Sequence, residues 1–364
     1  MLLEVMGNTK ERRRRGNRNG AKGGEQAPRH QFTKSAVAEK SSNLPQNGVH
    51  PPSKQTYKPH STLFVQFTEE TPTWYECGRN TAGRDDTIFS NSQSNKSNTR
   101  DIIAKYRQQA DDIYNHEVSL SRQSTTGGAS YSEKDEKWVE NTMKRGTLKD
   151  RVAAMSVVVG MDCMHKLYAL DMLLDLAGCG LGGADAGSVP NSRVGVMASE
   201  ALSDLFVNTL LPKDRKLISL DSRPLYLYEG DRNLSPRVLL LWRFEEMIKL
   251  RFASYLTRYL GRTLAGEDEP AKKSALATAS TLLMQVQEGE EVLLAMIVNK
   301  IGDPGRKIAS AAGHQLRLIL QEHPAMVNVV AREVRRCTAI SFIVNNSFLP
   351  SLTLFDNCYS RFNN

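Results

Sequence analysis

The chain has 364 residues, enough for one or two domains, and its five cysteines without a C-x-x-C pair argue against a disulfide framework or a zinc finger. Residues 1–60 hold twelve Lys and Arg against four Glu, so this segment alone carries the formal net charge of +8 of the whole chain. The formal charges of the other residues sum to zero, which excludes a body that is basic throughout. No stretch is apolar over the length that a membrane span requires.

Residues 1–60 are predicted to be a disordered basic tail. They are rich in Gly, Asn, Gln, Ser and Pro, so burial of apolar surface cannot offset the entropy of ordering them. The apolar start is too short for a signal peptide, and we expect an intracellular, soluble protein. Within the tail, Arg12, Arg13, Arg14 and Arg15 form a cluster of the kind that directs nuclear import or contacts RNA phosphates. A tail that only increases solubility is the alternative.

Residues 61–98 are predicted to be a short docking segment followed by a linker. Aromatic residues such as Phe64 and Trp74 stand in polar surroundings, which is typical of an extended segment that docks on the body or on a partner. An N-terminal piece of the body's own core explains the same pattern equally well. Residues 99–145 should form helices that lead into the body, because apolar residues recur there at helical spacing.

Residues 146–337 are predicted to be a helical array. Thr147 and Asp150 have the spacing of a capping box at its start, and a helix that is apolar nearly all round follows at residues 163–177. The next segment, residues 178–183, formally matches G-x-G-x-x-G. A dinucleotide site needs a strand before this motif and a helix directly after it, so we predict a loop that binds no cofactor.

The longest irregular stretch of the array follows a helix that ends at Pro212. Its basic residues outnumber its acidic residues, and they are Lys213, Arg215, Lys216 and Arg223. We therefore predict that this loop contacts RNA phosphates. An ordinary solvated connection, in which Asp214 and Asp221 compensate part of the charge, is the alternative.

The second half of the array contains the clearest helix boundaries. Pro236 should open a long helix whose aromatic residues belong to the core, and not to a platform that stacks on bases. Gly302, Asp303 and Pro304 are predicted to close one helix in the left-handed conformation, to cap the next helix and to occupy its first turn. The amphipathic helix that follows is typical of a HEAT-type repeat. About eight helices in pairs predict an all-α, HEAT-like α-solenoid.

The residue pattern does not favour an enzyme or a metal protein. An enzyme would need a nucleophile with a base, or a metal cluster, and the seven histidines show no ligand spacing with Cys, Asp or Glu. His314 lies in the middle of the amphipathic helix and is predicted to be an interior or boundary residue. We expect no catalytic residues, no cofactor and no metal.

Several motifs, taken in order, resemble one known family. They are Trp74-Tyr75-Glu76, Gly146-Thr147-Leu148 with Asp150-Arg151, Asp204-Leu205-Phe206, Leu210-Leu211-Pro212 with Arg215-Lys216-Leu217, Ser222-Arg223-Pro224-Leu225, Leu241-Trp242 with Phe244-Glu245, and Val298-Asn299-Lys300-Ile301-Gly302-Asp303-Pro304. Over residues 62–337 the chain resembles the N-terminal half of the nucleolar complex family, also called the CCAAT-binding factor or CCAAT/enhancer-binding protein zeta family.

The resemblance implies a non-enzymatic, HEAT-like scaffold for early assembly of the large ribosomal subunit in the nucleus and nucleolus. The partners it implies are pre-ribosomal RNA, a second nucleolar complex protein and large-subunit precursor particles, without a membrane. A nuclear transcription factor of the CCAAT-binding type and a pure protein–protein adaptor remain as alternatives. Residues 338–364 do not follow the family pattern, and we expect a divergent tail that caps the array poorly, so that the isolated chain associates with itself or needs its partner to stay soluble.

Overall fold

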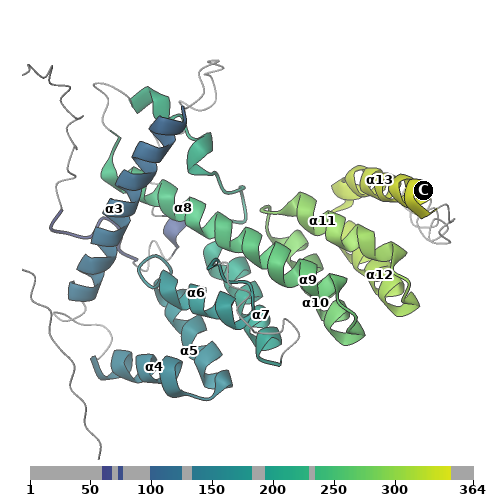
Figure 1. Ribbon diagram of the computed structural model, residues 1–364, viewed down its shortest axis with the longest axis horizontal. Helices are drawn as coiled ribbons and strands as arrows, with labels where there is room; N and C mark the ends of the chain where they lie inside the picture. Colours follow the sequence, from purple (N-terminus) through teal and green to yellow (C-terminus); the bar gives the residue numbers. More distant parts are fainter. Residues whose placement is uncertain are drawn as a thin grey trace, which may run out of the picture. The chain divides into compact units, whose positions relative to one another are not determined.

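The computed structural model describes residues 60–67, 73–76, 99–124, 133–182, 193–228 and 234–345. All of them belong to one unit, Thr56–Asn364. Every regular element in the described residues is a helix, which confirms the all-α prediction (Figure 1). Residues 1–59 of the predicted tail, with its arginine cluster at residues 12–15, and the chain after Asn345 lie outside the described residues.

Eleven α-helices follow one another through the part of the chain that the structure describes. They are α3 (Arg100–Ser124), α4 (Glu133–Arg145), α5 (Leu148–Met161), α6 (Leu167–Leu176), α7 (Arg193–Leu205), α8 (Pro236–Ser254), α9 (Arg262–Ala265), α10 (Glu269–Gln285), α11 (Glu290–Asn299), α12 (Arg306–Glu322) and α13 (Val327–Asn345). Within the described ranges, none of them combines the length and the apolar character that a bilayer span needs. Two π-helical segments, η1 (Phe206–Leu210) and η4 (Tyr255–Gly261), continue α7 and α8.

The later helices pack in two layers, as in a HEAT-like array. α10 lies beside α12 in one layer, α11 lies beside α13 in the other, and α10 and α11 pack on each other as a pair (Figure 1). In the earlier part, α5, α6 and α7 contact one another, α4 packs on α5, and α3 packs across α8 (Figure 1). Contacts between α7 and α10 join the two groups. The predicted α-solenoid is therefore confirmed.

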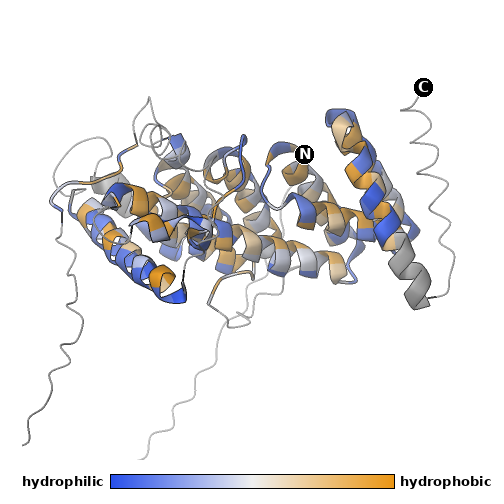
Figure 2. Ribbon diagram, turned by 90° about the horizontal axis from the view of Figure 1, so that it is seen from above, coloured by the Kyte–Doolittle hydropathy of each residue, from blue (hydrophilic) through white to orange (hydrophobic). Residues whose placement is uncertain are grey.

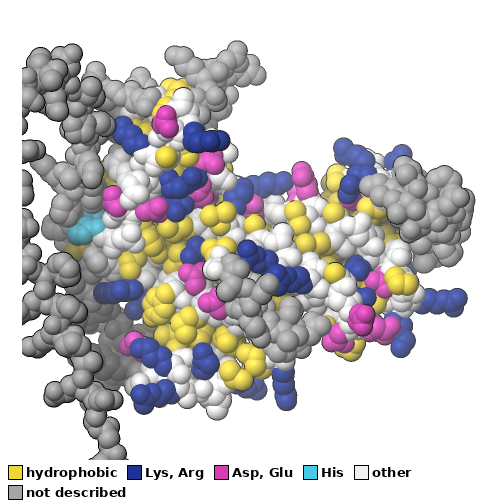
Figure 3. All heavy atoms as spheres, in the orientation of Figure 1, with side chains coloured by type: hydrophobic (Ala, Val, Ile, Leu, Met, Phe, Trp, Pro, Cys, Tyr) yellow, Lys and Arg dark blue, Asp and Glu magenta, His cyan; other side chains and the backbone are white. Residues whose placement is uncertain are grey.

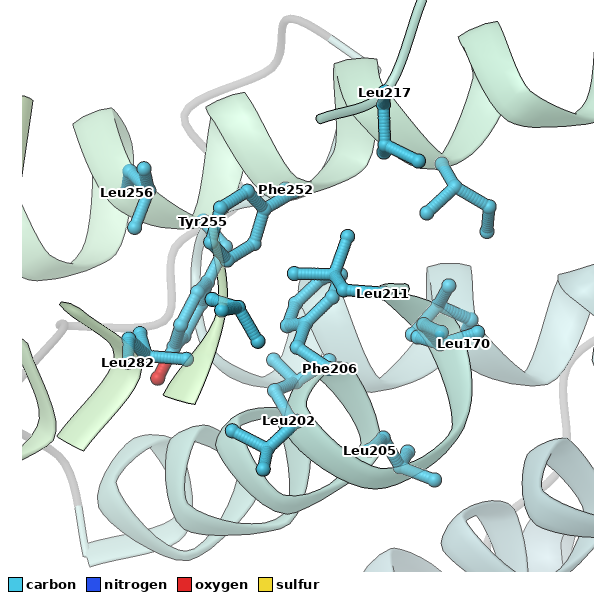
Figure 4. Packing of buried hydrophobic residues seen from close by; sticks show 14 of the residues in the cluster. Leu170, Leu202, Leu205, Phe206, Leu211, Leu217, Phe252, Tyr255, Leu256 and Leu282 are labelled. Atoms are coloured by element: carbon cyan, nitrogen blue, oxygen red, sulfur yellow. The ribbon is translucent and has the colours of Figure 1, made fainter. Parts of the chain in front are cut away.

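Aromatic and aliphatic side chains from η1, α8 and η4 form the centre of the core (Figure 4). The ring centroid of Phe206 lies 4.9 Å from that of Phe252 and 5.4 Å from that of Tyr255. The Tyr255 hydroxyl is 2.9 Å from Ser199 Oγ, so the phenol has a polar partner although it is buried. The aromatic residues of α8 are thus core residues, as predicted. Figure 2 shows that hydrophobic residues gather along one side of many helices.

The predicted helix start at Thr147 and the predicted loop after α6 are both observed. Thr147 Oγ1 accepts a hydrogen bond from Asp150 N at 3.3 Å and donates one to Asp150 Oδ2 at 2.6 Å. After α6, Gly178 takes a φ of 73°, and the glycine-rich residues that are described form turns. A helix precedes this segment, so it lacks the strand that a dinucleotide site requires.

The turn between α11 and α12 differs from the prediction. Gly302 ends a 3-10 turn without a positive φ, and Pro304 precedes α12, which begins at Arg306. Asp303 still serves the helix start, because its Oδ1 accepts a hydrogen bond from Gly305 N at 3.0 Å. The 3-10 turn closes α11 by tightening its last carbonyl bonds, which makes a left-handed glycine unnecessary. His314 is exposed on α12, so the prediction of an interior or boundary residue is wrong.

The segment before α3 contributes to the body's own core. Val65 is fully buried, and Trp74 is 2% exposed. The indole of Trp74 donates a hydrogen bond to the Leu210 carbonyl at 2.9 Å, and its ring lies 5.4 Å from that of Phe244. Val65 and Trp74 are therefore core residues, which agrees with the second interpretation of this segment, a piece of the body's own core.

Candidate nucleic-acid interface

The basic loop, defined here as residues 211–223, runs beside α8 and is fastened to it by its own leucines. Leu211, Leu217 and Leu220 are buried, and Figure 4 shows Leu211 and Leu217 among the core residues. Backbone groups of Leu217 are also bound: Glu288 Oε2 accepts from Leu217 N at 2.7 Å, and Lys249 Nζ donates to Leu217 O at 2.6 Å. The loop is irregular in secondary structure, but its backbone is held in place.

A single buried carboxylate organises the basic residues of this loop. Glu245 of α8 is 3% exposed and accepts hydrogen bonds from Arg215, from Ile218 N at 2.9 Å and from Arg223 Nη2 at 2.7 Å. The guanidinium of Arg223 also lies over the Trp242 ring, 4.9 Å from its centroid. A buried charge is stable only when paired and hydrogen-bonded, and these contacts supply both conditions.

The four predicted phosphate contacts therefore occupy different surroundings. Arg223 is 5% exposed and turned toward Glu245, so an RNA phosphate would have to replace a buried carboxylate to reach it. The burial of Arg223 beside Glu245 argues against a phosphate contact at this residue. Glu245 lies 22 residues further along the chain, too far to be recognised in the sequence as a local acid. The side chains of Arg215 and Lys216 are 38% and 53% exposed, and they pair with Glu245 and Glu290. Lys213 is exposed, and among the described residues no ion pair holds it.

A second network beside the loop ties α3 to α8. Glu246 Oε1 accepts a hydrogen bond from Arg107 Nη2 at 2.8 Å, and its Oε2 accepts one from Arg243 Nη1 at 2.5 Å. Arg107 also contacts Asp221 of the basic loop at 2.7 Å, and Arg243 contacts Asp111 at 2.6 Å. Most charged side chains near the loop thus form ion pairs with one another. Lys213 and the exposed parts of Arg215 and Lys216 are the groups that can contact an anion.

The sequence did not indicate a third polar cluster, the Glu117 cluster (His60, Glu117, Asp162 and His165). Glu117 of α3 is fully buried and accepts hydrogen bonds from Phe64 N at 2.8 Å, Val65 N at 3.0 Å and His60 Nε2 at 2.8 Å. His165 Nε2 lies 3.7 Å from Glu117 Oε1, and His165 Nδ1 lies 2.9 Å from Asp162 Oδ1. The cluster fastens the segment before α3 to α3 and to the turn before α6.

Burial and pairing oppose each other in the Glu117 cluster, and pairing prevails. Burial disfavours the ionised carboxylate of Glu117, but His165, the Val65 amide and His60 together lower its pKa. Burial likewise disfavours the imidazolium of His165, but Asp162 and Glu117 raise its pKa to about 9. The cluster is therefore a buried ion pair at neutral pH. Glu117 meets His60, the Phe64 and Val65 amides and His165 only in the folded chain, because these residues are far from it in the sequence, and only the Asp162–His165 pair is local.

The described residues contain no group of three or more His, Cys, Asp or Glu side chains arranged to hold a metal ion. The predicted absence of catalytic, cofactor-binding and metal residues stays a prediction. Chemically, the basic loop offers a rigid edge with one unpaired ammonium and two half-exposed cations, which suits contact with a phosphate backbone better than group transfer.

No protein-family model matches the chain. It is 33% identical to human "CCAAT/enhancer-binding protein zeta" over 258 residues, which is 69% of the chain and 23% of that protein. It is 32% identical to "Nucleolar complex protein 1" of Drosophila melanogaster over 208 residues, 56% of the chain and 17% of the relative. It is 28% identical to "Ribosome biogenesis protein NOC1" of Chaetomium thermophilum over 215 residues, 55% of the chain and 20% of the relative. The matched region thus spans less than a quarter of these relatives.

Proposed function

Because the chain is homologous to CCAAT/enhancer-binding protein zeta and nucleolar complex protein 1, the family that its motifs resemble, we propose that it acts as a non-enzymatic scaffold in ribosome biogenesis. The proposal places it in the nucleus and nucleolus during early assembly of the large subunit. Its proposed partners are pre-ribosomal RNA, large-subunit precursor particles and a second nucleolar complex protein. The names of two relatives, a nucleolar complex protein and a ribosome biogenesis protein, support this role.

One structural observation carries the proposal: a rigid helical array holds a basic edge in a fixed position. The basic loop is anchored by Glu245 and Glu288 while Lys213 faces solvent. Ordering a mobile loop on binding would cost about 1–2 kcal/mol of backbone entropy per residue. The backbone of the basic loop is already held in place, so an anion that binds there does not incur this cost.

We propose Lys213 as the principal phosphate contact of the basic loop, with Arg215 and Lys216 in support. The two supporting side chains are half exposed, and each can turn part of its charge toward an added phosphate while staying near its carboxylate. Arg223 is not part of this proposal, because its guanidinium is buried. Residues 12–15 remain a proposed signal for nuclear import and a source of non-specific RNA affinity.

The experiment is cross-linking of the tagged full chain to nucleic acid in cells, followed by sequencing and by sedimentation of the same extract. Cross-links to large-subunit precursor RNA, together with co-sedimentation with precursor particles, are the expected result. Cross-links to promoter DNA would instead support a transcription factor of the CCAAT-binding type. If the chain associates stably with other proteins but cross-links to neither RNA nor DNA, the result would support the pure adaptor and overturn the RNA role.

A further inference from the structure

α5 has apolar residues on all sides, although the structure covers only part of its surface. Val152, Met155 and Val159 are buried, with exposed fractions of 6%, 0% and 0%. On the opposite side, Val157 is 51% exposed and Met161 is 49% exposed. A helix that is hydrophobic all round normally has neighbours all round.

The neighbours that α5 does have lie on one side. Its principal contacts within the described residues are with α4, α6 and α7. Its other side, called here the α5 face, consists of Lys149, Ala153, Val157, Gly160 and Met161, which fall on one strip at helical spacing and are all exposed. Figure 3 shows hydrophobic side chains gathered on the side of the molecule where α5 and α6 lie.

The α5 face has the shape that a second helix needs. A Cβ atom added at Gly160 would meet nothing within 4 Å, so the strip is open at this point. Ala153 and Gly160 are small and leave room for another helix to approach closely between Val157 and Met161. In an array of stacked repeats, an outer surface without a neighbour is expected to be polar, and this one is not.

The charges around the α5 face indicate which kind of helix fits. Of the nearby acids, Glu140 pairs with Lys144 and Asp162 pairs with His165, whereas Asp150 bonds only the uncharged Thr147 and stays exposed. Arg145 at the end of α4 and Lys149 in the first turn of α5 are exposed, and no ion pair of the described residues holds either one. These two cations outnumber the exposed Asp150, so the accessible charge beside the strip is net positive, which complements acidic residues on a partner.

We propose that the α5 face binds an amphipathic helix of a partner protein, with an apolar strip against Val157 and Met161 and acidic residues toward Arg145 and Lys149. This inference rests on the proposed function, which requires a protein partner, and it locates the surface for that partner. It assigns protein binding to α5 and phosphate contact to the basic loop. An RNA backbone would not bury Val157 or Met161, because its outer surface is charged.

The test uses the full chain with Ala153→p-benzoylphenylalanine, irradiated in nuclear extract, and sequencing of the cross-linked peptides. The expected product is one protein segment with helical apolar spacing and flanking acids. A synthetic peptide of that sequence should bind the purified chain directly, measured by fluorescence anisotropy. Cross-links to RNA, to a second copy of the chain or to many unrelated segments would overturn the proposal.

Two variants with a matched control make the outcome specific. Gly160→Glu adds bulk and negative charge in open space, so folding should be unaffected while cross-link yield and peptide affinity fall at least tenfold. Val157→Asp should act in the same way. Gly313→Glu on α12 is the control, because a Cβ there also meets nothing within 4 Å. Equal yields for Gly160→Glu and Gly313→Glu would overturn the proposal.

Co-sedimentation with large-subunit precursors separates this inference from the proposed function. If the wild-type chain does not co-sediment, the scaffold role fails. Whether the peptide binds the chain, and whether Gly160→Glu weakens that binding, still shows whether the α5 face binds a partner helix. If the chain co-sediments and Gly160→Glu leaves the cross-links unchanged, the scaffold role stands and the α5 face does not bind the partner.

Discussion

The Glu117 cluster predicts two losses of stability in the body. One occurs at alkaline pH, and the other follows the isosteric substitution Glu117→Gln. His165 has a pKa raised from 6.5 to about 9 by its carboxylate neighbours, and this rise corresponds to about 3 kcal/mol of unfolding free energy. Because the folded state binds the proton more tightly, this contribution is complete below pH 6.5 and is lost as the pH rises to about 9.

Glu117→Gln keeps the shape of the side chain but removes the charge that faces His165 and His60. Breaking one partner of a buried ion pair costs about 3–5 kcal/mol, and here two backbone amides also lose a charged acceptor. At about 2–4 °C per kcal/mol for a body of this size, the melting temperature should fall by roughly 6–20 °C. The alkaline loss of stability should also become smaller, because the pKa of His165 would no longer be raised as far.

The assay is urea unfolding followed by circular dichroism between pH 6 and pH 9.5. Glu140→Gln is the control, since it removes an exposed carboxylate that pairs with Lys144 and should cost less than about 0.5 kcal/mol. His165→Gln identifies the titrating group, because the free energy of unfolding of this variant should change less between pH 6 and pH 9.5 than that of any other chain in the series. A wild-type stability that stays constant from pH 6.5 to pH 9, or a Glu117→Gln cost equal to that of Glu140→Gln, would refute the reasoning.

Lys213→Glu should weaken RNA cross-linking without changing the melting temperature. Arg223→Glu should unfold the chain, because it places a second carboxylate beside Glu245. Equal melting temperatures for the two variants would contradict the buried position of Arg223. Asp303→Ala should lower the free energy of unfolding by about 1–2 kcal/mol, and the cost should be smaller in acid. Burial opposes ionisation of Asp303, but Gly305 N and Lys300 lower its pKa, so its contribution to stability disappears as the pH falls through that pKa. Calorimetry of both chains at pH 3 and pH 7 measures the difference. Gly289→Ala should cost more than 1 kcal/mol, because the residue has a φ of 73° and the added Cβ would lie 2.7 Å from Leu256 Cδ1; an unchanged midpoint in urea would disprove this. Replacing the arginines at residues 12–15 by alanine should reduce the salt dependence of RNA binding by a slope of about 3, measured by titration between 50 and 200 mM salt.

Local patterns predicted most of the fold because helix starts and apolar spacing are properties of neighbouring residues. Thr147 and Pro236 start helices as expected, since a cap or an N-terminal proline acts within one turn. At the end of α11 the same logic failed, because a 3-10 turn closes that helix and Gly302 needs no positive φ. At α11, the positive φ belongs instead to Gly289, which precedes the helix.

The candidate site could be predicted only in part, because its charges are decided by partners far away in the sequence. The basic loop was located correctly from the excess of basic residues after Pro212. Whether each cation faces solvent depends on Glu245 and Glu290, which lie on other helices. Glu117 gave no signal at all, since a lone acid on a helix is normally solvated and the backbone amides it binds lie more than 50 residues earlier.

The bond between Trp74 and Leu210 also has a consequence for the order of events during synthesis. The two residues are 136 positions apart, so the indole leaves the ribosome long before its acceptor exists. At about 5–20 residues per second, the delay is roughly 7–27 s. During this interval Val65 and Trp74 have none of the core that later buries them, and a nascent chain in that condition is a substrate for chaperones. The segment before α3 is therefore synthesised before the helices that bury it and is among the last parts of the body to reach its native position.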